Sequence, residues 1–324
     1  MTEEVARLYG YGELPSELPD VPPPTTPEDP QLAWEMKTKK LLAGFGYTEL
    51  YGYSMVSVND FLRYDLDPQD AVQIHNPLSA DMTHMRTSLM PSLLNDIERN
   101  QGERPSGKLF ELQRVYVKRE GDLPDERTQL TMAQYGLRDV EQAFFSLKGA
   151  LMSWAEKVGL VLTLDREETD PHWHPTRCAK LFVDGEDVGR IGQVAAKDQE
   201  AFGIDRPVVA AAVDFESLVG KLATIRRYEP IPEFPSVQRD LAVLLDVFTP
   251  YADVASTVEA VDDLIDHVDL VEVYQGQGIE EGKKSVTLSL TLQPREATLT
   301  SDQIDAVMAK VGKVLEKEFA GTIR

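Results

Sequence analysis

The stretch KSVTLSLTL, residues 284–292, constrains the fold more than any other part of this sequence. Its apolar and hydroxyl side chains alternate without a break, and a β-strand is the structure that puts successive side chains on opposite faces. One set of side chains should therefore face a core and the other set the opposite side of a sheet. The inward set is Val286, Leu288, Leu290 and Leu292, and the outward set is Ser285, Thr287, Ser289 and Thr291.

The segments around this strand complete an α+β module of βαββαβ order, at residues 228–324. Further strands are expected at 239–246 and 267–276, helices from Thr249-Pro250 to 261 and at 301–319, and an edge strand in the closing AGTIR. In this order the helices cover one sheet face and leave the other open to solvent. An open face with hydroxyls and an aromatic ring is a common platform for unstacked RNA bases.

A proline-dense, acidic stretch at 12–30, GELPSELPDVPPPTTPEDP, predicts an extended linker. Residues 1–11 before it have a short amphipathic pattern with too little apolar surface to fold alone. We interpret them as the tail of an upstream domain.

Residues 31–225 predict a mainly antiparallel sheet with helices packed on it. The helices are expected at 31–45 with Leu32 and Met36 on the buried stripe, at 88–100, and at 141–158 with Phe145 buried. The strands are expected at 47–57, 108–118, 128–137, 160–165, 179–184, 187–194 and 207–214. Their close spacing and turns such as Asp184-Gly185 favour hairpins. No GxGxxG follows a strand, which argues against a dinucleotide-binding fold.

The composition excludes several classes of protein. A single cysteine, Cys178, rules out an internal disulfide framework and suits a reducing cytoplasm. No apolar run approaches the ~18 residues that span a bilayer, so we expect no membrane association. The net charge of −22 argues against wholesale electrostatic binding of nucleic acid, and DNA is not an expected partner. RNA binding by stacking stays open.

Two groups of residues could suggest chemistry in the body of the chain. His172, His174 and Cys178 are spaced unlike common zinc sites, so a loop with surface histidines and a packing thiol is the simpler reading. Ser79 and Ser88, with His75 or His84 as a base, lack the strained turn of a G-x-S-x-G nucleophile. Loop and cap roles are expected for them.

Three charged residues leave a binding role and a structural role open. Arg86 precedes a helix, where it could meet a phosphate or form a salt bridge. Glu111 and Arg114 lie in the expected strand KLFELQRVYV, where they could meet a ligand on one sheet face or form an ion pair.

In the closing module, Tyr274 and Glu272 should share one face of their strand, and the neighbouring strand can place Ser285 beside them. The alternatives are simple edge packing of the tyrosine and stacking of its ring on a base.

Several stretches, read together, resemble the bacterial phenylalanyl-tRNA synthetase beta subunit, in that family's order and over almost the whole chain. VARLYGYGELPSELP resembles the end of its nucleic-acid-binding-like domain. NPLSADMTHMRTSLMPSLLNDIERN, LFELQRVYV and HPTRCAKLFVDGEDVGRIGQV resemble its catalytic-like domain. YEPIPEFPSVQRDLAVLLD, VYQGQGIEEGKKSVTLSLTLQP and AGTIR resemble its ferredoxin-fold anticodon-binding domain.

The resemblance implies a class II synthetase-like antiparallel sheet domain without an active site, followed by a ferredoxin-like anticodon-binding domain. The absence of a GxGxxR motif late in the body agrees with this. Such a subunit partners a catalytic alpha subunit in an (αβ)₂ heterotetramer, which uses ATP to attach phenylalanine to tRNA-Phe. This chain would be the C-terminal part of the subunit and inactive alone.

The resemblance also implies site residues. Tyr274 would stack on an anticodon base, Glu272 and Ser285 would hydrogen-bond base edges, and Lys283 and Lys284 would meet phosphates. Glu3 and Glu4 match two ligands of an acidic Mg²⁺ site in the family, a partial site here. Ala195-Ala196 replaces a His-Pro pair that is frequent in the family.

Alternative functions stay open at this point. Anticodon modules of this kind also occur fused to active class II ligase domains, and a free-standing RNA-binding or regulatory paralogue would have the same module. Phenylalanine-dependent exchange of pyrophosphate into ATP by the chain alone would indicate the ligase. RNA binding without an alpha subunit would indicate the paralogue.

Overall fold

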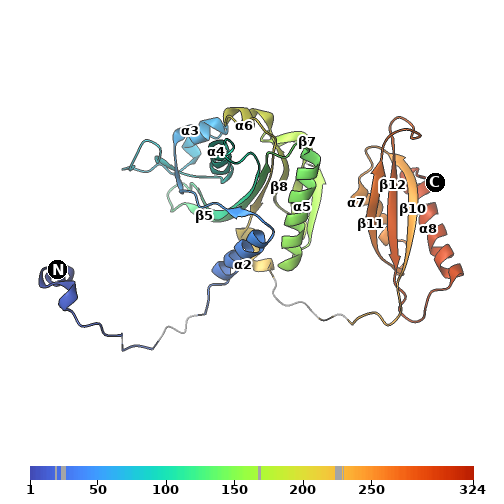
Figure 1. Ribbon diagram of the computed structural model, residues 1–324, viewed down its shortest axis with the longest axis horizontal. Helices are drawn as coiled ribbons and strands as arrows, with labels where there is room; N and C mark the ends of the chain where they lie inside the picture. Colours follow the sequence, from blue (N-terminus) through green and yellow to red (C-terminus); the bar gives the residue numbers. More distant parts are fainter. Residues whose placement is uncertain (19, 23–26, 167–168, 223–227, 229) are drawn as a thin grey trace. The chain divides into compact units, whose positions relative to one another are not determined.

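A computed structural model describes the chain except residues 19, 23–26, 167–168, 223–227 and 229 (Figure 1). The chain divides into two compact units, Met1–Arg226 and Arg227–Arg324, and each is described by itself. The first unit starts with helix α1 (Thr2–Tyr9), the 3-10 turn η1 (Tyr11–Glu13) and a proline-rich stretch. None of the described helices is both long and apolar enough to cross a membrane.

The first unit is built on a large sheet. Among the described residues it has seven strands in the order β1-β4-β5-β9-β8-β7-β6, antiparallel except where β1 runs parallel to β4. Asp184 and Gly185 both adopt positive φ, the twist that a tight two-residue hairpin needs, so the expected β7–β8 turn is confirmed. The strands are β1 (Thr48–Glu49), β4 (Gly107–Val117), β5 (Asp125–Tyr135), β6 (Leu162–Arg166), β7 (Trp173–Val183), β8 (Glu186–Val194) and β9 (Val208–Asp214).

Helices cover both faces of this sheet (Figure 1). Alternation along β5 sends Leu130 and Met132 into a core with α2 (Pro30–Gly44) and α5 (Val140–Lys157). It sends Ala133 and Tyr135 into a second core with α4 (Met90–Asn100). The smaller elements of this unit are β2 (Met55–Val56), α3 (Val58–Arg63), η2 (Pro68–Asp70), β3 (His84–Met85), α6 (Ala196–Ala201) and η3 (Glu216–Lys221).

Some expectations for this unit are wrong. The strand expected at 47–57 exists only as β1 and β2, because the backbone between them takes other partners: the Gly52 N–H donates to the Glu111 carboxylate. Leu32 and Met36 are exposed, since α2 buries Trp34, Thr38 and Leu42 instead. The Thr38 hydroxyl accepts a hydrogen bond from the buried Trp154 indole at 3.1 Å, which makes a polar residue part of the buried stripe.

Phe145 is also exposed, contrary to expectation. Leu147, Leu151 and Trp154 follow one another at helical spacing on the buried side of α5. Phe145 lies two residues before Leu147, about 200° around the helix, and so points away from the core.

The second unit has the order βαββαβ in its described residues, and its four strands lie as β11-β12-β10-β13, all antiparallel. This is the ferredoxin-like arrangement. Helix 301–319 is confirmed as α8, and AGTIR contributes the edge strand β13 as expected. The elements are β10 (Val237–Asp246), α7 (Tyr251–Glu259), β11 (Ile265–Tyr274), β12 (Lys283–Leu292), α8 (Ser301–Phe319) and β13 (Thr322–Ile323).

The inward residues of β12 are confirmed as buried, and they form one core with α7 and α8. Thr249 does not cap α7, contrary to expectation. The helix begins after Pro250 without a side-chain cap, while the Thr249 carbonyl accepts a hydrogen bond from Lys284.

Candidate functional site

The sheet face of the second unit that lies away from α7 and α8 brings together most of the site residues expected from sequence. Antiparallel register sets Tyr274 of β11 opposite Ser285 of β12, and Ser285 opposite Leu244 of β10. Glu272 lies opposite Thr287 on the same face, after a β-bulge between Leu270 and Glu272. Before the bulge, His267 and Asp269 lie on this face; the extra residue at the bulge shifts the alternation, so that Glu272 and Tyr274 follow them on the same face.

Tyr274 lies at the end of β11 and is 42% exposed. A Cβ built at Gly276 would lie 2.8 Å from the tyrosine hydroxyl oxygen, so the ring packs against a residue without a side chain. The hydroxyl donates to the Gln277 carbonyl at 3.4 Å. The ring is therefore held over the turn and still open on one side to a stacking partner.

The residues around Tyr274 differ in access. Glu272 is exposed, whereas Ser285 is only 8% exposed, because side chains on the neighbouring strands cover the hydroxyl of a central strand. Glu272 is therefore open to direct contact with a ligand. Ser285 would need its neighbours to move.

The two lysines lie on opposite faces of β12. Lys283 pairs with Asp246, while Lys284 pairs with the core residue Leu245. Lys284 Nζ donates to the Thr249 carbonyl at 2.6 Å, and burial lowers the pKa of its amine. Adjacent strand residues must point apart, so Lys284 lies away from the face that carries Tyr274.

His267 lies on the same face, although the sequence did not identify it as a site residue. It lies opposite Thr291, and its ring nitrogens contact Asp266 at 3.0 Å and Asp269 at 3.2 Å. The hydrogen bond with Asp266 raises the pKa of the imidazole. The pattern D-H-x-D in a strand was the available signal, since residues two apart share a face.

Glu3 and Glu4 do not make a magnesium site by themselves. Glu4 is ion-paired with Arg7 at 2.8 Å, on an exposed helix. Mg²⁺ takes about six oxygen ligands, and no group of three His, Cys, Asp or Glu that could hold a metal occurs among the described residues.

The histidine–cysteine group of the body is structural. His172, His174 and Cys178 belong to strand β7 or border it, rather than to a loop, because a bulge between Trp173 and Cys178 lets the strand extend through them. His172 stacks on Tyr64 with 4.1 Å between centroids and contacts the buried Asp198 at 3.1 Å. Cys178 is buried in the core under α4.

Arg86 and Glu111 form a buried ion pair of 2.7 Å, with side chains 2% and 0% exposed. Glu111 and Arg114 share neither a face nor an ion pair, because an odd separation along a strand puts them on opposite faces; Arg114 pairs with Glu126. The expectation that Ser88 caps α4 is wrong, because the N-cap residue is Leu89 and makes no side-chain cap bond; Ser88 Oγ accepts from the N–H of Met90, the first residue of the helix. Ser79 Oγ accepts from the Asp81 N–H in a loop.

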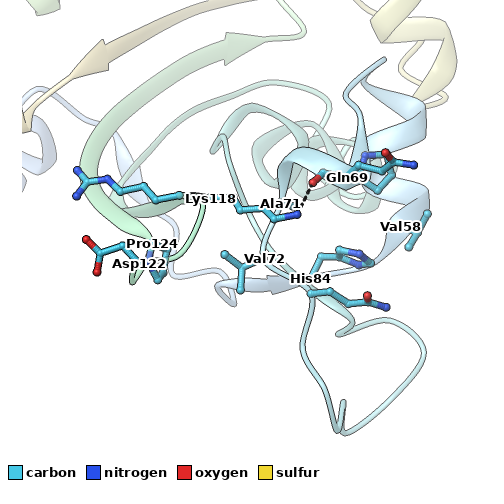
Figure 2. Close-up of a pocket in the computed structure, with 11 residues that line it drawn as sticks. Val58, Gln69, Ala71, Val72, His84, Lys118, Asp122 and Pro124 are labelled. Carbon is cyan, nitrogen blue, oxygen red and sulfur yellow. Dashed lines mark hydrogen bonds between the residues drawn. The ribbon is translucent and has the colours of Figure 1, made fainter.

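A cavity of about 640 Å³ lies where the η2 segment, β3 and the β4–β5 connection meet (Figure 2). Figure 2 shows Val58 and His84 on one side of it and Lys118 and Asp122 on the other. Lys118 Nζ donates to the Gln69 carbonyl at 3.0 Å, and the His84 ring packs edge-on against Phe61. Lys118 and Arg119 of this cavity already have hydrogen-bond or ion-pair partners, so we do not take the cavity as the candidate site in place of the open sheet face.

Comparisons with known proteins match both units. The model of the phenylalanyl tRNA synthetase beta chain CLM domain matches residues 14–215, and that of the ferredoxin-fold anticodon binding domain matches residues 232–324.

The curated relatives are phenylalanine–tRNA ligase beta subunits. Those of Xanthomonas axonopodis pv. citri and Clostridium acetobutylicum are 34% and 29% identical over 338 and 333 residues. Each alignment covers 100% of this chain, and the chain spans 42% of each relative's length.

Proposed function

This chain belongs to the phenylalanyl-tRNA synthetase beta chain family, and we propose that it forms part of the non-catalytic beta subunit of a phenylalanine–tRNA ligase. Its role is to support a catalytic alpha subunit and to bind tRNA-Phe. Within it, residues 1–11 end an upstream domain, 12–30 form a linker, 31–225 form the body and 228–324 bind the anticodon.

One observation supports this function most directly. The unit matched by the anticodon-binding model leaves one sheet face open and holds the half-exposed Tyr274 ring on it. Stacking on an aromatic ring contributes roughly 1–3 kcal/mol per base and needs no net positive charge. An acidic chain can therefore bind an unpaired anticodon base through Tyr274, with Glu272 beside it as a hydrogen-bond acceptor and Lys283 near the backbone.

Access sets the order of importance among the proposed contacts. Ser285 is covered and Lys284 is engaged with Thr249, so we assign them supporting roles behind Tyr274 and Glu272.

We propose that the body is a class II synthetase-like domain that has lost its chemistry. A largely antiparallel sheet with helices on both faces supports the fold. The mutual neutralisation of Arg86 and Glu111 inside the protein supports the loss, because neither side chain is available to a substrate. ATP-dependent charging of tRNA-Phe then takes place on the alpha subunit of a cytoplasmic (αβ)₂ assembly. No step is assigned to magnesium on this chain.

Binding of a fluorescein-labelled tRNA-Phe anticodon stem-loop tests the RNA-binding role. Tyr274→Ala should weaken binding about tenfold, or ~1.4 kcal/mol, because the stacking surface is lost. Tyr274→Phe keeps the ring and should bind like the parent chain. Fluorescence anisotropy at fixed ionic strength measures both.

A stem-loop with a different anticodon is the matched ligand control. Equal binding of both stem-loops, or an alanine variant that binds as tightly as the parent, would overturn the anticodon role of Tyr274.

A further inference from the structure

A second cavity in the first unit, of about 590 Å³, is lined by segments that the proposed function leaves unused. It lies among α3, α4, the 51–57 segment and residues 81–82. Tyr51 and Tyr53 line it with side chains that are 83% and 71% exposed. Lys39 Nζ already lies over the Tyr51 ring, 5.9 Å from its centroid, whereas no described cation lies over the ring of Tyr53, which is available to a bound group.

Several polar groups of this cavity already satisfy one another. Arg63 donates to Asn95 at 2.9 Å and to Glu98 at 3.0 Å, and its Nε donates to the Ala201 carbonyl. Asn95 in turn donates to Asp60 at 2.7 Å. This network fixes the geometry of one wall and leaves no charge there for a ligand.

Asp96 stands outside that network. It lies on α4, half-buried, and no described residue hydrogen-bonds or ion-pairs with its carboxylate. Burial raises the pKa of Asp96; Arg99 opposes this shift, and the Glu111 charge adds to it. Arg99 attracts the Asp96 carboxylate but forms no described ion pair with it, so the partly desolvated oxygens of Asp96 keep room for the hydrogen bonds of a bound cation.

Glu111 lies behind the cavity wall. Gly52 lines the cavity, and its N–H donates to Glu111 Oε1 at 3.3 Å, the same oxygen that accepts from Arg86. Glu111 Oε2 is fully buried and has no hydrogen-bond partner among the described residues. Thr131, opposite Glu111 in register, has an equally unpartnered Oγ1. Neither Glu111 nor Thr131 lines the cavity itself, and the Glu111 charge bears on it through Asp96, whose pKa it helps to raise.

We propose that this cavity binds an organic cation, a guanidinium or ammonium group on an aliphatic stem. Asp96 accepts its hydrogen bonds, and Tyr53 meets its positive charge with a ring face. The group comes either from a free amine or from an arginine or lysine side chain of a protein.

The other charged groups of the cavity also favour a positively charged ligand. Asp81 and Asp96 are acidic groups of the cavity without a described ion-pair partner, against the single unpaired Arg99. The whole chain carries a net charge of −22, which attracts cations from a distance. Since no described group of three His, Cys, Asp or Glu could hold a metal, an organic cation fits better than a metal ion.

Calorimetric titration of the intact chain with Nα-acetyl-L-argininamide tests the proposal. The neutral, nearly isosteric Nα-acetyl-L-citrullinamide should bind about tenfold more weakly, because it lacks the charge-assisted hydrogen bonds. Asp96→Asn should cause a similar loss for the arginine probe. Asp205→Asn, which removes an exposed carboxylate elsewhere in the same unit, should leave binding unchanged.

Tyr53→Ala provides a second variant, with an expected loss of about two- to fivefold from the cation–π contact. A ten-residue peptide with one arginine among apolar residues distinguishes the sources: tighter binding than the amide indicates a protein side chain, and equal binding a free cation. Equal affinity of the two amides, or equal effects of Asp96→Asn and Asp205→Asn, would mean diffuse attraction to an acidic protein and would overturn the proposal.

Discussion

Arg86 and Glu111 illustrate why charged residues in a strand are hard to interpret one at a time. Burial of both charges is tolerated because Arg86 also donates to the Arg114 carbonyl and Glu111 also accepts from Gly52. Glu111 pairs with a residue 25 positions earlier rather than with its neighbour Arg114. The alternation of side chains along β4 excludes a pair between Glu111 and Arg114, but the pair with Arg86 can be known only from the folded structure.

His267 should make the stability of the second unit depend on pH. Its pKa is raised above the unfolded value of about 6.5 by Asp266 first and then by Asp269. The imidazolium therefore contributes stability below about pH 6.5, and that contribution is lost as pH rises through the folded pKa. The urea midpoints of parent and His267→Gln should differ at pH 6 and converge at pH 9.

An NMR titration of the His267 ring provides the direct control. A midpoint at or below that of an unstructured histidine would contradict the ion-pair account, whatever the denaturation curves show. The effect should be modest, because about half of the side chain is exposed and solvent screens the pair.

At the scale of elements, the helix at 301–319 was predictable to the residue and the segment 47–57 was not. Helix α8 has a strong apolar stripe and a capping box in which Thr300 and Gln303 satisfy each other's N–H groups. The 47–57 segment has strand-forming residues, but its Tyr51 and Tyr53 are exposed and its Gly52 binds a side chain. A sequence pattern predicts a segment well where hydrogen bonds between nearby residues determine its structure, as in α8, and poorly where distant residues determine it, as in 47–57.

The capping box of α8 gives a prediction at this scale. Thr300→Ala leaves the first-turn N–H of Gln303 without its side-chain acceptor and should lower the free energy of unfolding by about 1 kcal/mol. Urea unfolding followed by far-UV circular dichroism measures the change.

Thr300→Ser keeps the hydroxyl and should unfold like the parent. A loss of the same size in the serine variant would assign the effect to the threonine methyl group instead of the cap.

At the scale of the whole molecule, the order of the two family domains was predictable, because their motifs follow one another as in the family, but the short helices α3 and α6 were not. The ferredoxin-like module was readable from residues alone, since the alternation in 284–292 specifies both faces of a central strand. The site was readable only in part. The sequence alone predicted that Tyr274 and Glu272 lie together. It did not predict that Ser285 is covered, that Lys284 binds the Thr249 carbonyl or that His267 contacts Asp266, because these depend on how the folded elements meet.

The central claim is that this chain works as part of a beta subunit beside a catalytic alpha subunit. Its most direct test is size-exclusion chromatography with light scattering, on the chain mixed with the phenylalanine–tRNA ligase alpha subunit of the same organism. We predict a single species that contains both chains in equal amounts. Separate elution of the two chains, each with the mass it has alone, would contradict the claim.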